Sequence, residues 1–214
     1  MSDRPKHRKT QAERSQETQE RITLAAIEVL RKNGYAGFRV ADVAEEAGVS
    51  RGAQTHHFPS KVDLILTAFS ALFARTAESS RERIANIKPG DDVIQAMVSD
   101  ASDFFLSEDF TMSLDMLASA ERDPDLRGGI GAIAKRTRSF VEDMWIGLLL
   151  SRGLSREDSE DILWLVFSAI RGLSVRLLWQ FDEHRFNRLK EITYKAAKDI
   201  YDAKRSPDFL KRNK

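Results

Sequence analysis

The chain of 214 residues is long enough for one or two domains with a sizeable buried core. Its formal net charge of +1 means that any affinity for nucleic acid must come from local basic patches. The sequence has no cysteine and no apolar run of about 18 residues, which excludes disulfides, thiolate metal sites and a membrane-spanning helix. Since the chain also starts with charged residues and no apolar signal, we expect a soluble cytoplasmic protein.

The composition predicts an all-α protein. Ala, Leu, Glu and Arg are abundant, strand-like runs are rare, and only five prolines interrupt the chain. Apolar residues at helical spacing, separated by breaks at Gly, Pro and Asp, divide the sequence into about nine helices.

The first twelve residues (1–12) are basic and poor in apolar side chains. Arg4, Lys6, Arg8 and Lys9 cluster there, so we expect a disordered segment. It is either an arm that reaches DNA phosphates or the minor groove, or a plain solvated tail. A helix over 13–33 follows, ended by a Gly at position 34, after which Tyr35 and Phe38 are expected to fill the core of the first domain.

The next stretch has the layout of a helix-turn-helix. An apolar face over 40–47 predicts a short helix, and Gly48 is suited to the left-handed turn that would end it. Ser50 can cap a second short helix over 51–58, and Pro59 stops that helix. Because the second helix is polar and flanked by basic residues, it is suited to a DNA major groove.

Residues 18–66 resemble the DNA-binding domain of the TetR family of transcriptional regulators. The matching segments are RITLAAIEVL, GY at 34–35, DVAEEAGVS at 42–50 and HFPSKVDL at 57–64. The resemblance implies a three-helix DNA-binding domain over 13–66 with its motif at 40–59. It also implies a helical ligand-binding and dimerisation domain over 67–205, followed by a tail over 206–214.

The residue types around the second motif helix indicate how it would contact DNA. Arg51 could reach a guanine edge or a phosphate, and the small side chains that follow it would let the backbone approach closely. Gln54 stands where the family has an aliphatic residue, so it turns either outward to a base or inward to the core. Arg39 stands where the family has a capping Thr and could itself bind phosphate. The predicted DNA contacts are Arg39, Arg51, Gly52, Ala53, Gln54, Thr55, His56, His57 and Lys61.

Five further helices follow a long connecting helix over 60–87. Asp91 is expected to cap the first of them, over 91–106, and shorter helices follow over 110–120 and 124–151, the latter weakened at Gly128 and Gly129. The helix over 156–181 is apolar on nearly every side, which predicts burial on every side. A last amphipathic helix covers 184–204.

The second domain offers two candidate features. Large apolar side chains with one arginine describe a small-molecule pocket, although they describe an ordinary core equally well. The last two helices offer more apolar surface than one chain can cover, and the resemblance implies that two such pairs form a four-helix bundle across a homodimer. Arg171 and Trp179 could belong to either feature. The predicted pocket residues are Phe104, Phe105, Met112, Met116, Trp145, Phe167 and Arg171.

The resemblance to the TetR family implies a homodimeric repressor that a small-molecule effector releases from a pseudo-palindromic operator, and we take this as the predicted function. The alternative is a regulator of the same fold that answers to a protein partner and has no effector. No acid/base pair, nucleophile or phosphate-binding Gly loop points to an enzyme or a cofactor. Adjacent helical residues such as His56 and His57 point about 100° apart, which argues against a metal site.

Overall fold

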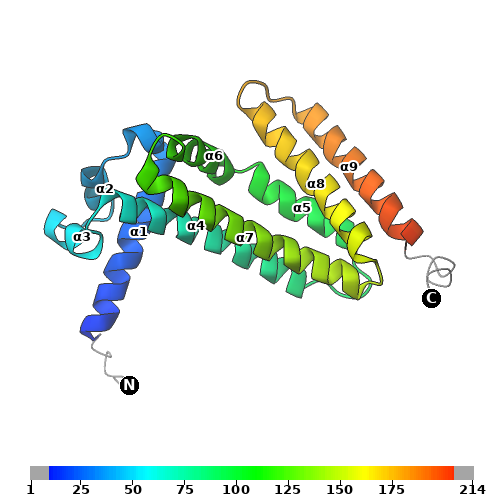
Figure 1. The fold of residues 1–214 in the computed structure, drawn as a ribbon, viewed down its shortest axis with the longest axis horizontal. Helices are drawn as coiled ribbons and strands as arrows, with labels where there is room; N and C mark the ends of the chain where they lie inside the picture. The colour runs from blue at the N-terminus through cyan, green and yellow to red at the C-terminus, as the bar shows by residue number, and fades with distance from the viewer. Residues whose placement is uncertain (1–9, 205–214) are drawn as a thin grey trace, which may run out of the picture. The chain divides into compact units, whose positions relative to one another are not determined.

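A computed structural model gives the structure of the protein and describes residues 10–204 (Figure 1). Within this stretch all regular structure is helical, as predicted, and none of the helices has the length and apolar character needed to cross a membrane. Positions 1–9 of the basic arm expected over 1–12 lie outside the described residues, and so does the whole tail expected over 206–214. The nine helices described are α1 (Gln11–Gly37), α2 (Val40–Glu46), α3 (Arg51–His57), α4 (Lys61–Ala85), α5 (Val93–Phe105), α6 (Glu108–Ala120), α7 (Pro124–Ser151), α8 (Arg156–Leu177) and α9 (Glu183–Lys204).

The chain divides into two compact units. Among the described residues, unit 1 holds the chain up to Leu72 together with Asp115–Ile130, and unit 2 holds Phe73–Leu114 together with the chain from Gly131 to Lys204. The division falls inside α4, α6 and α7, so these three helices each contribute residues to both units. The sequence did not indicate that residues 115–130 would join the first unit.

Local capping explains where α1 begins. Thr10 and Glu13 form a capping box in which each side chain accepts a hydrogen bond from the other residue's backbone N–H, so the helix starts at Gln11 rather than near residue 13. At the other end, Gly34 has a φ of +63°, which breaks the helical geometry as predicted. The chain then makes one further helical turn before Phe38.

The core of unit 1 is built from apolar side chains of α1, α2 and α4. Ile22, Leu30, Leu64 and Phe69 are among the residues with no more than 1 % of their surface exposed. Burial of each such side chain contributes about 1.5–3 kcal/mol to folding. This packing holds the first half of α4 in the same core as the helix-turn-helix.

Gly129 permits α7 to approach α4 closely within unit 1. A Cβ atom at Gly129 would lie 2.6 Å from a methyl carbon of Leu66, whereas a Cβ atom at Gly128 would have no neighbour within 4 Å. The pair of glycines was expected to weaken or kink this helix, but α7 continues through both positions from Pro124 to Ser151.

In unit 2, α8 and α9 run side by side and α5 packs against both (Figure 1). Asp92, not the expected Asp91, caps α5: its carboxylate accepts the N–H groups of Ile94 and Gln95, both at 3.0 Å. The same carboxylate accepts a hydrogen bond from Tyr194 of α9 at 2.8 Å. Burial acts to raise the pKa of Asp92, but these hydrogen bonds and nearby Lys198 outweigh it and lower the pKa below its ordinary value.

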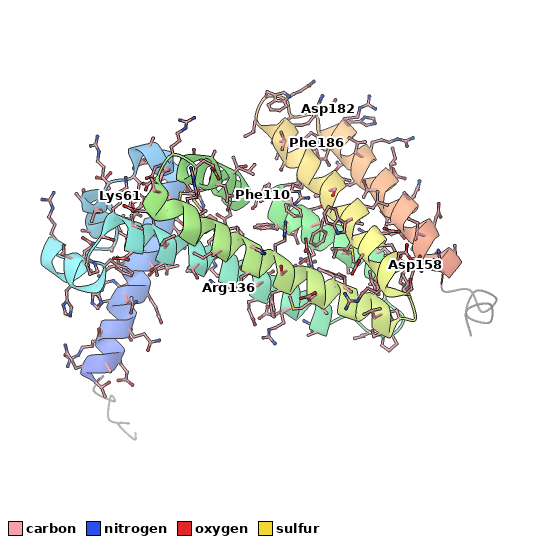
Figure 2. All side chains as sticks on the ribbon, in the orientation of Figure 1. Lys61, Phe110, Arg136, Asp158, Asp182 and Phe186 are labelled. Atoms are coloured by element: carbon pink, nitrogen blue, oxygen red, sulfur yellow. The ribbon has the colours of Figure 1, made fainter. Side chains whose placement is uncertain are left out.

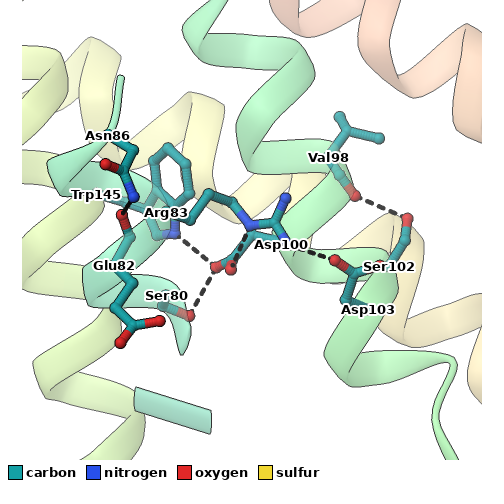
Figure 3. Close-up of polar contacts among 9 residues, drawn as sticks. All are labelled: Ser80, Glu82, Arg83, Asn86, Val98, Asp100, Ser102, Asp103 and Trp145. Carbon is teal, nitrogen blue, oxygen red and sulfur yellow. Dashed lines mark hydrogen bonds and ion pairs between the residues drawn. The ribbon is translucent and has the colours of Figure 1, made fainter. Parts of the chain in front are cut away.

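A buried carboxylate joins three helices of unit 2 (Figure 3). Asp100 of α5 accepts hydrogen bonds from Ser80 of α4 at 2.8 Å and from the indole N–H of Trp145 of α7 at 2.9 Å. Arg83 of α4 donates to its other oxygen at 3.2 Å and also pairs with Asp103. The negative charge is therefore both hydrogen-bonded and paired, which offsets the cost of its burial.

The prediction that the helix over 156–181 is buried on every side is wrong for the single chain. α8 ends at Leu177, and Trp164 is 65 % exposed while Trp179, just beyond the helix, is 66 % exposed. On the neighbouring α9, Leu189 and Ile192 are exposed as well. The single chain thus leaves several large apolar side chains of α8 and α9 open to water.

The two glycines of α7 provide a test of this packing. We expect Gly128→Ala to raise the free energy of unfolding by about 0.5–1 kcal/mol, because alanine favours the helix and meets no neighbour. Gly129→Ala should give no such gain, because Leu66 would have to move. Urea unfolding of both variants measures the difference, and equal gains would contradict the close approach.

Candidate DNA-binding surface

The turn between α2 and α3 is built from local backbone preferences. Gly48 has a φ of +61°, and Val49 donates its N–H to the carbonyl of Ala44 at 3.0 Å, which closes the end of α2. Ser50 then caps α3, since its hydroxyl accepts the N–H of Ala53 at 3.1 Å. These bonds fix the direction in which α3 leaves the turn.

Arg21 of α1 also secures this turn, and the sequence analysis missed it. Its guanidinium donates to the carbonyl oxygens of Ala47 at 2.7 Å and Gly48 at 3.2 Å. Those carbonyls stand at the end of α2, where helical partners are missing. Because these two carbonyls lie 26 and 27 positions after Arg21 in the sequence, no local pattern could have indicated the contact.

Most of the predicted DNA contacts are available at the surface. Ala53 and His57 of α3 are half-buried, and the rings of His56 and His57 lie edge to face, 5.4 Å apart. Nowhere in residues 10–204 are three His, Cys, Asp or Glu side chains placed together to hold a metal ion. The exposed members of the predicted set are Arg39, Arg51, Gly52, Thr55, His56 and Lys61.

Gln54 takes the inward of its two expected orientations. Its side chain is only 2 % exposed, and its amide nitrogen donates to the carbonyl oxygen of Phe58 at 3.1 Å. Phe58 is itself buried at the end of α3. Gln54 therefore holds the end of the helix, and its side chain does not lie on the surface offered to DNA.

Arg39 and Lys61 border α2 and α3 in the sequence. Arg39 stands at the N-cap position of α2 without making a capping hydrogen bond, so its side chain is not used in the cap. Lys61 begins α4, where Figure 2 labels it, and its ammonium lies 5.0 Å from the ring centroid of Tyr35 and 5.7 Å from that of Phe38. The aromatic rings hold this cation close to the end of α1.

The predicted pocket residues of unit 2 centre on an aromatic cluster, which we define as Phe104, Phe105, Phe110 and Phe167. Neighbouring rings in it lie 5.0–5.6 Å apart, and Phe110 is labelled in Figure 2. The guanidinium of Arg171 lies 5.7 Å from the centroid of Phe105. Arg171 is half-buried, and among the described residues it has no carboxylate partner.

The remaining predicted pocket residues have other surroundings. Trp145 is fully buried and donates to Asp100, so its polar group is already used in the core. Met112 is buried in unit 2, whereas Met116 is buried in unit 1. The predicted pocket set is thus divided between the two units, because the boundary falls inside α6.

Comparison with known proteins places these features in a family. Residues 22–68 match the family model described as bacterial regulatory proteins, tetR family. Over 194 residues, the chain is 56 % identical to the HTH-type transcriptional regulator CymR of Pseudomonas putida. The aligned region covers 91 % of this chain and 96 % of that protein.

Solved structures share the fold at low sequence identity. A TetR transcription regulator from Haloarcula marismortui superposes with a TM-score of 0.62 at 18 % identity, over 88 % of this chain and 98 % of that one. The transcriptional regulator FadR from Bacillus subtilis, solved in complex with stearoyl-CoA, gives a TM-score of 0.56 at 19 % identity, over 82 % and 97 %. All these relatives are described as regulators of transcription and not as enzymes.

Proposed function

Because the chain belongs to the TetR family of transcriptional regulators, we propose that it is a homodimeric repressor that a small molecule releases from its operator. The observation that carries the DNA-binding part is the capped α3, which presents Arg51, Thr55 and His56 at the surface. An arginine in the first turn of such a helix suits the guanine edge in a major groove. The protein would act in the cytoplasm on a pseudo-palindromic operator.

The exposed apolar surface of α8 and α9 supports the homodimer. Trp164 and Val175 of α8 and Leu189 and Ile192 of α9 are all exposed in the single chain. Two copies of this helix pair would form a four-helix bundle that removes these side chains from water. The dimer would set its two recognition helices about 34–36 Å apart, the spacing of successive major grooves.

The aromatic cluster and Arg171 support an effector site in unit 2. Arg171 offers guanidinium donors without a carboxylate partner among the described residues, beside the ring of Phe105. An oxyanion attached to an apolar or aromatic body would satisfy both groups. The complex of FadR with stearoyl-CoA indicates that this fold can hold a small molecule.

A second candidate is a regulator of the same fold that answers to a protein partner and has no effector. The full burial of Trp145 and the close ring packing around Phe105 favour it, because both are typical of a filled core. The two candidates differ in whether any small molecule shifts DNA affinity.

The DNA contact is tested at Arg51. We expect Arg51→Ala to weaken binding to a duplex selected from a random library by about 1–3 kcal/mol, because a base contact is lost. Arg156→Ala, which removes an exposed arginine paired with Glu160 in unit 2, serves as the control and should bind like the wild type. Fluorescence anisotropy at fixed salt measures both, and an unchanged affinity for Arg51→Ala would remove it from the recognition surface.

The dimer is tested at Trp164. We expect Trp164→Glu to sediment as a monomer at micromolar concentration, because it would bury a charge in the interface. Phe140→Glu changes another exposed aromatic residue, on α7, and should leave the dimer intact. A Trp164→Glu variant that remains a dimer would show that α8 does not form the interface.

The effector site is tested at Arg171. We expect a thermal-shift screen of small aromatic compounds, each as a carboxylate and as its neutral amide, to give larger stabilisation by carboxylates. Arg171→Ala should abolish that preference, whereas Arg138→Ala, which removes an exposed arginine near Glu142, should retain it. Stabilisation that is equal for both compound forms, or absent, would favour the regulator without an effector.

A further inference from the structure

A set of contacts within unit 1 ties the end of α1 to residues from the second half of the chain. We call this set the clasp and define it as Tyr35, Lys61, Asp115 and Asp123. The backbone N–H of Tyr35 donates to Oδ2 of Asp115 on α6 at 2.9 Å. The phenol of Tyr35 donates to Oδ2 of Asp123, just before α7, at 2.6 Å. One residue of α1 is therefore held at two points by carboxylates 80 and 88 positions further on.

The break at Gly34 makes the first of these bonds possible. Gly34 has φ +63° and ψ −179°, a conformation that non-glycine residues rarely adopt. Because the helical geometry is interrupted at Gly34, the N–H of Tyr35 donates to a side chain of α6. A Cβ atom at Gly34 would lie 3.3 Å from Oδ2 of Asp115, so the carboxylate packs directly against the glycine.

Electrostatics favour the second bond. The hydrogen bond to Asp123 raises the pKa of Tyr35 to about 12, because the phenol donates to a carboxylate and would lose this bond on deprotonation. The same bond, with the nearby positive charge of Lys61 as a further contribution, lowers the pKa of Asp123 below its ordinary value. The Lys61 ammonium also lies over the Tyr35 ring, so a cation at the start of α4 is part of the same cluster.

The clasp involves the end of α1 that leads into the helix-turn-helix. Tyr35 stands five residues before the first residue of α2, Val40, and Phe38 between them is buried in the core of unit 1. Asp115 and Asp123 lie on the segment that α6 and α7 contribute to unit 1, while the rest of these two helices belongs to unit 2. The clasp therefore joins the end of α1, which leads into the helix-turn-helix, to a segment whose two helices continue into the other unit.

We propose that Asp115 and Asp123 are positioning residues for operator binding. They act through Tyr35 to fix the connection between α1 and α2, and thereby the positions of α2 and α3. This inference rests on the proposed function as a DNA-binding regulator. It assigns α6 and α7 a direct hold on the DNA-binding helices, in addition to the continuous helix α4. Neither carboxylate is assigned a contact with DNA.

Tyr35→Phe tests the proposal, because it removes the hydroxyl and keeps the ring under Lys61. Tyr194→Phe is the matched control, since Tyr194 makes an equivalent bond to Asp92 within unit 2. We expect Tyr35→Phe to weaken binding to the selected duplex about three- to tenfold, which corresponds to the net free-energy contribution of one hydrogen bond. Tyr194→Phe should bind like the wild type, and the salt dependence should be unchanged in both because no phosphate contact is lost.

A pair of substitutions at Asp115 separates positioning from a loss of folding. The amide oxygen of Asp115→Asn can still accept the N–H of Tyr35, whereas Asp115→Ala has no acceptor. We expect Asp115→Asn to retain most of the affinity for the duplex and Asp115→Ala to lose it, with both variants still folded by circular dichroism at the assay temperature.

The outcomes distinguish the proposal from the function on which it rests. If the wild-type protein selects no duplex from the library, the DNA-binding function itself fails. If the wild type selects a duplex and Tyr35→Phe and Asp115→Ala bind it as tightly as the wild type does, the clasp has no positioning role. A loss of affinity in Tyr194→Phe equal to that in Tyr35→Phe would likewise overturn it.

Discussion

The charge of Asp100 constrains how unit 2 can be arranged. A carboxylate in a core must keep its partners, because an unpaired buried charge costs several kcal/mol. Its partners come from α4 and α7, so these helices and α5 cannot separate without leaving the charge unpaired. The second half of α4 is fixed in this way to the unit that carries the aromatic cluster. Any motion that reaches α4 must therefore move the three helices together or break the network.

The first half of α4 is fixed in unit 1 by the burial of Leu64 and Phe69. One helix thus has each half fixed in a different core, and α6 and α7 are shared in the same manner. A regulator needs an element whose arrangement responds to both of its sites. Because three helices contribute residues to both units, we propose that Asp115 of α6 and Asp123, just before α7, take part in holding the helix-turn-helix.

Short-range features of the fold could be predicted from sequence, and long-range features could not. Gly48, Ser50 and Pro59 act on the residues next to them, so the helix-turn-helix was predicted almost to the residue. Arg21, Asp115 and Asp123 act on partners 26 to 88 positions away, and no periodicity reveals such contacts. The cap of α5 was assigned to Asp91, but it is Asp92, because the sequence alone does not show which of two adjacent aspartates has the backbone geometry of an N-cap. Burial of α8 was overestimated because an apolar pattern does not say which of its side chains a single chain covers, and the single chain leaves Trp164 exposed.

The three tryptophans of the chain stand in different surroundings, with a practical consequence. Trp145 is sealed in the core with its N–H held by Asp100, whereas Trp164 and Trp179 face outward on or just beyond α8. Indole emission shifts to shorter wavelength when water is removed from the ring. In the single chain, the intrinsic tryptophan fluorescence therefore combines emission from a buried indole with emission from two exposed ones, and burial of Trp164 in the proposed dimer would shift the emission of that residue to shorter wavelength. Association of two chains through α8 would thus be visible without an external label.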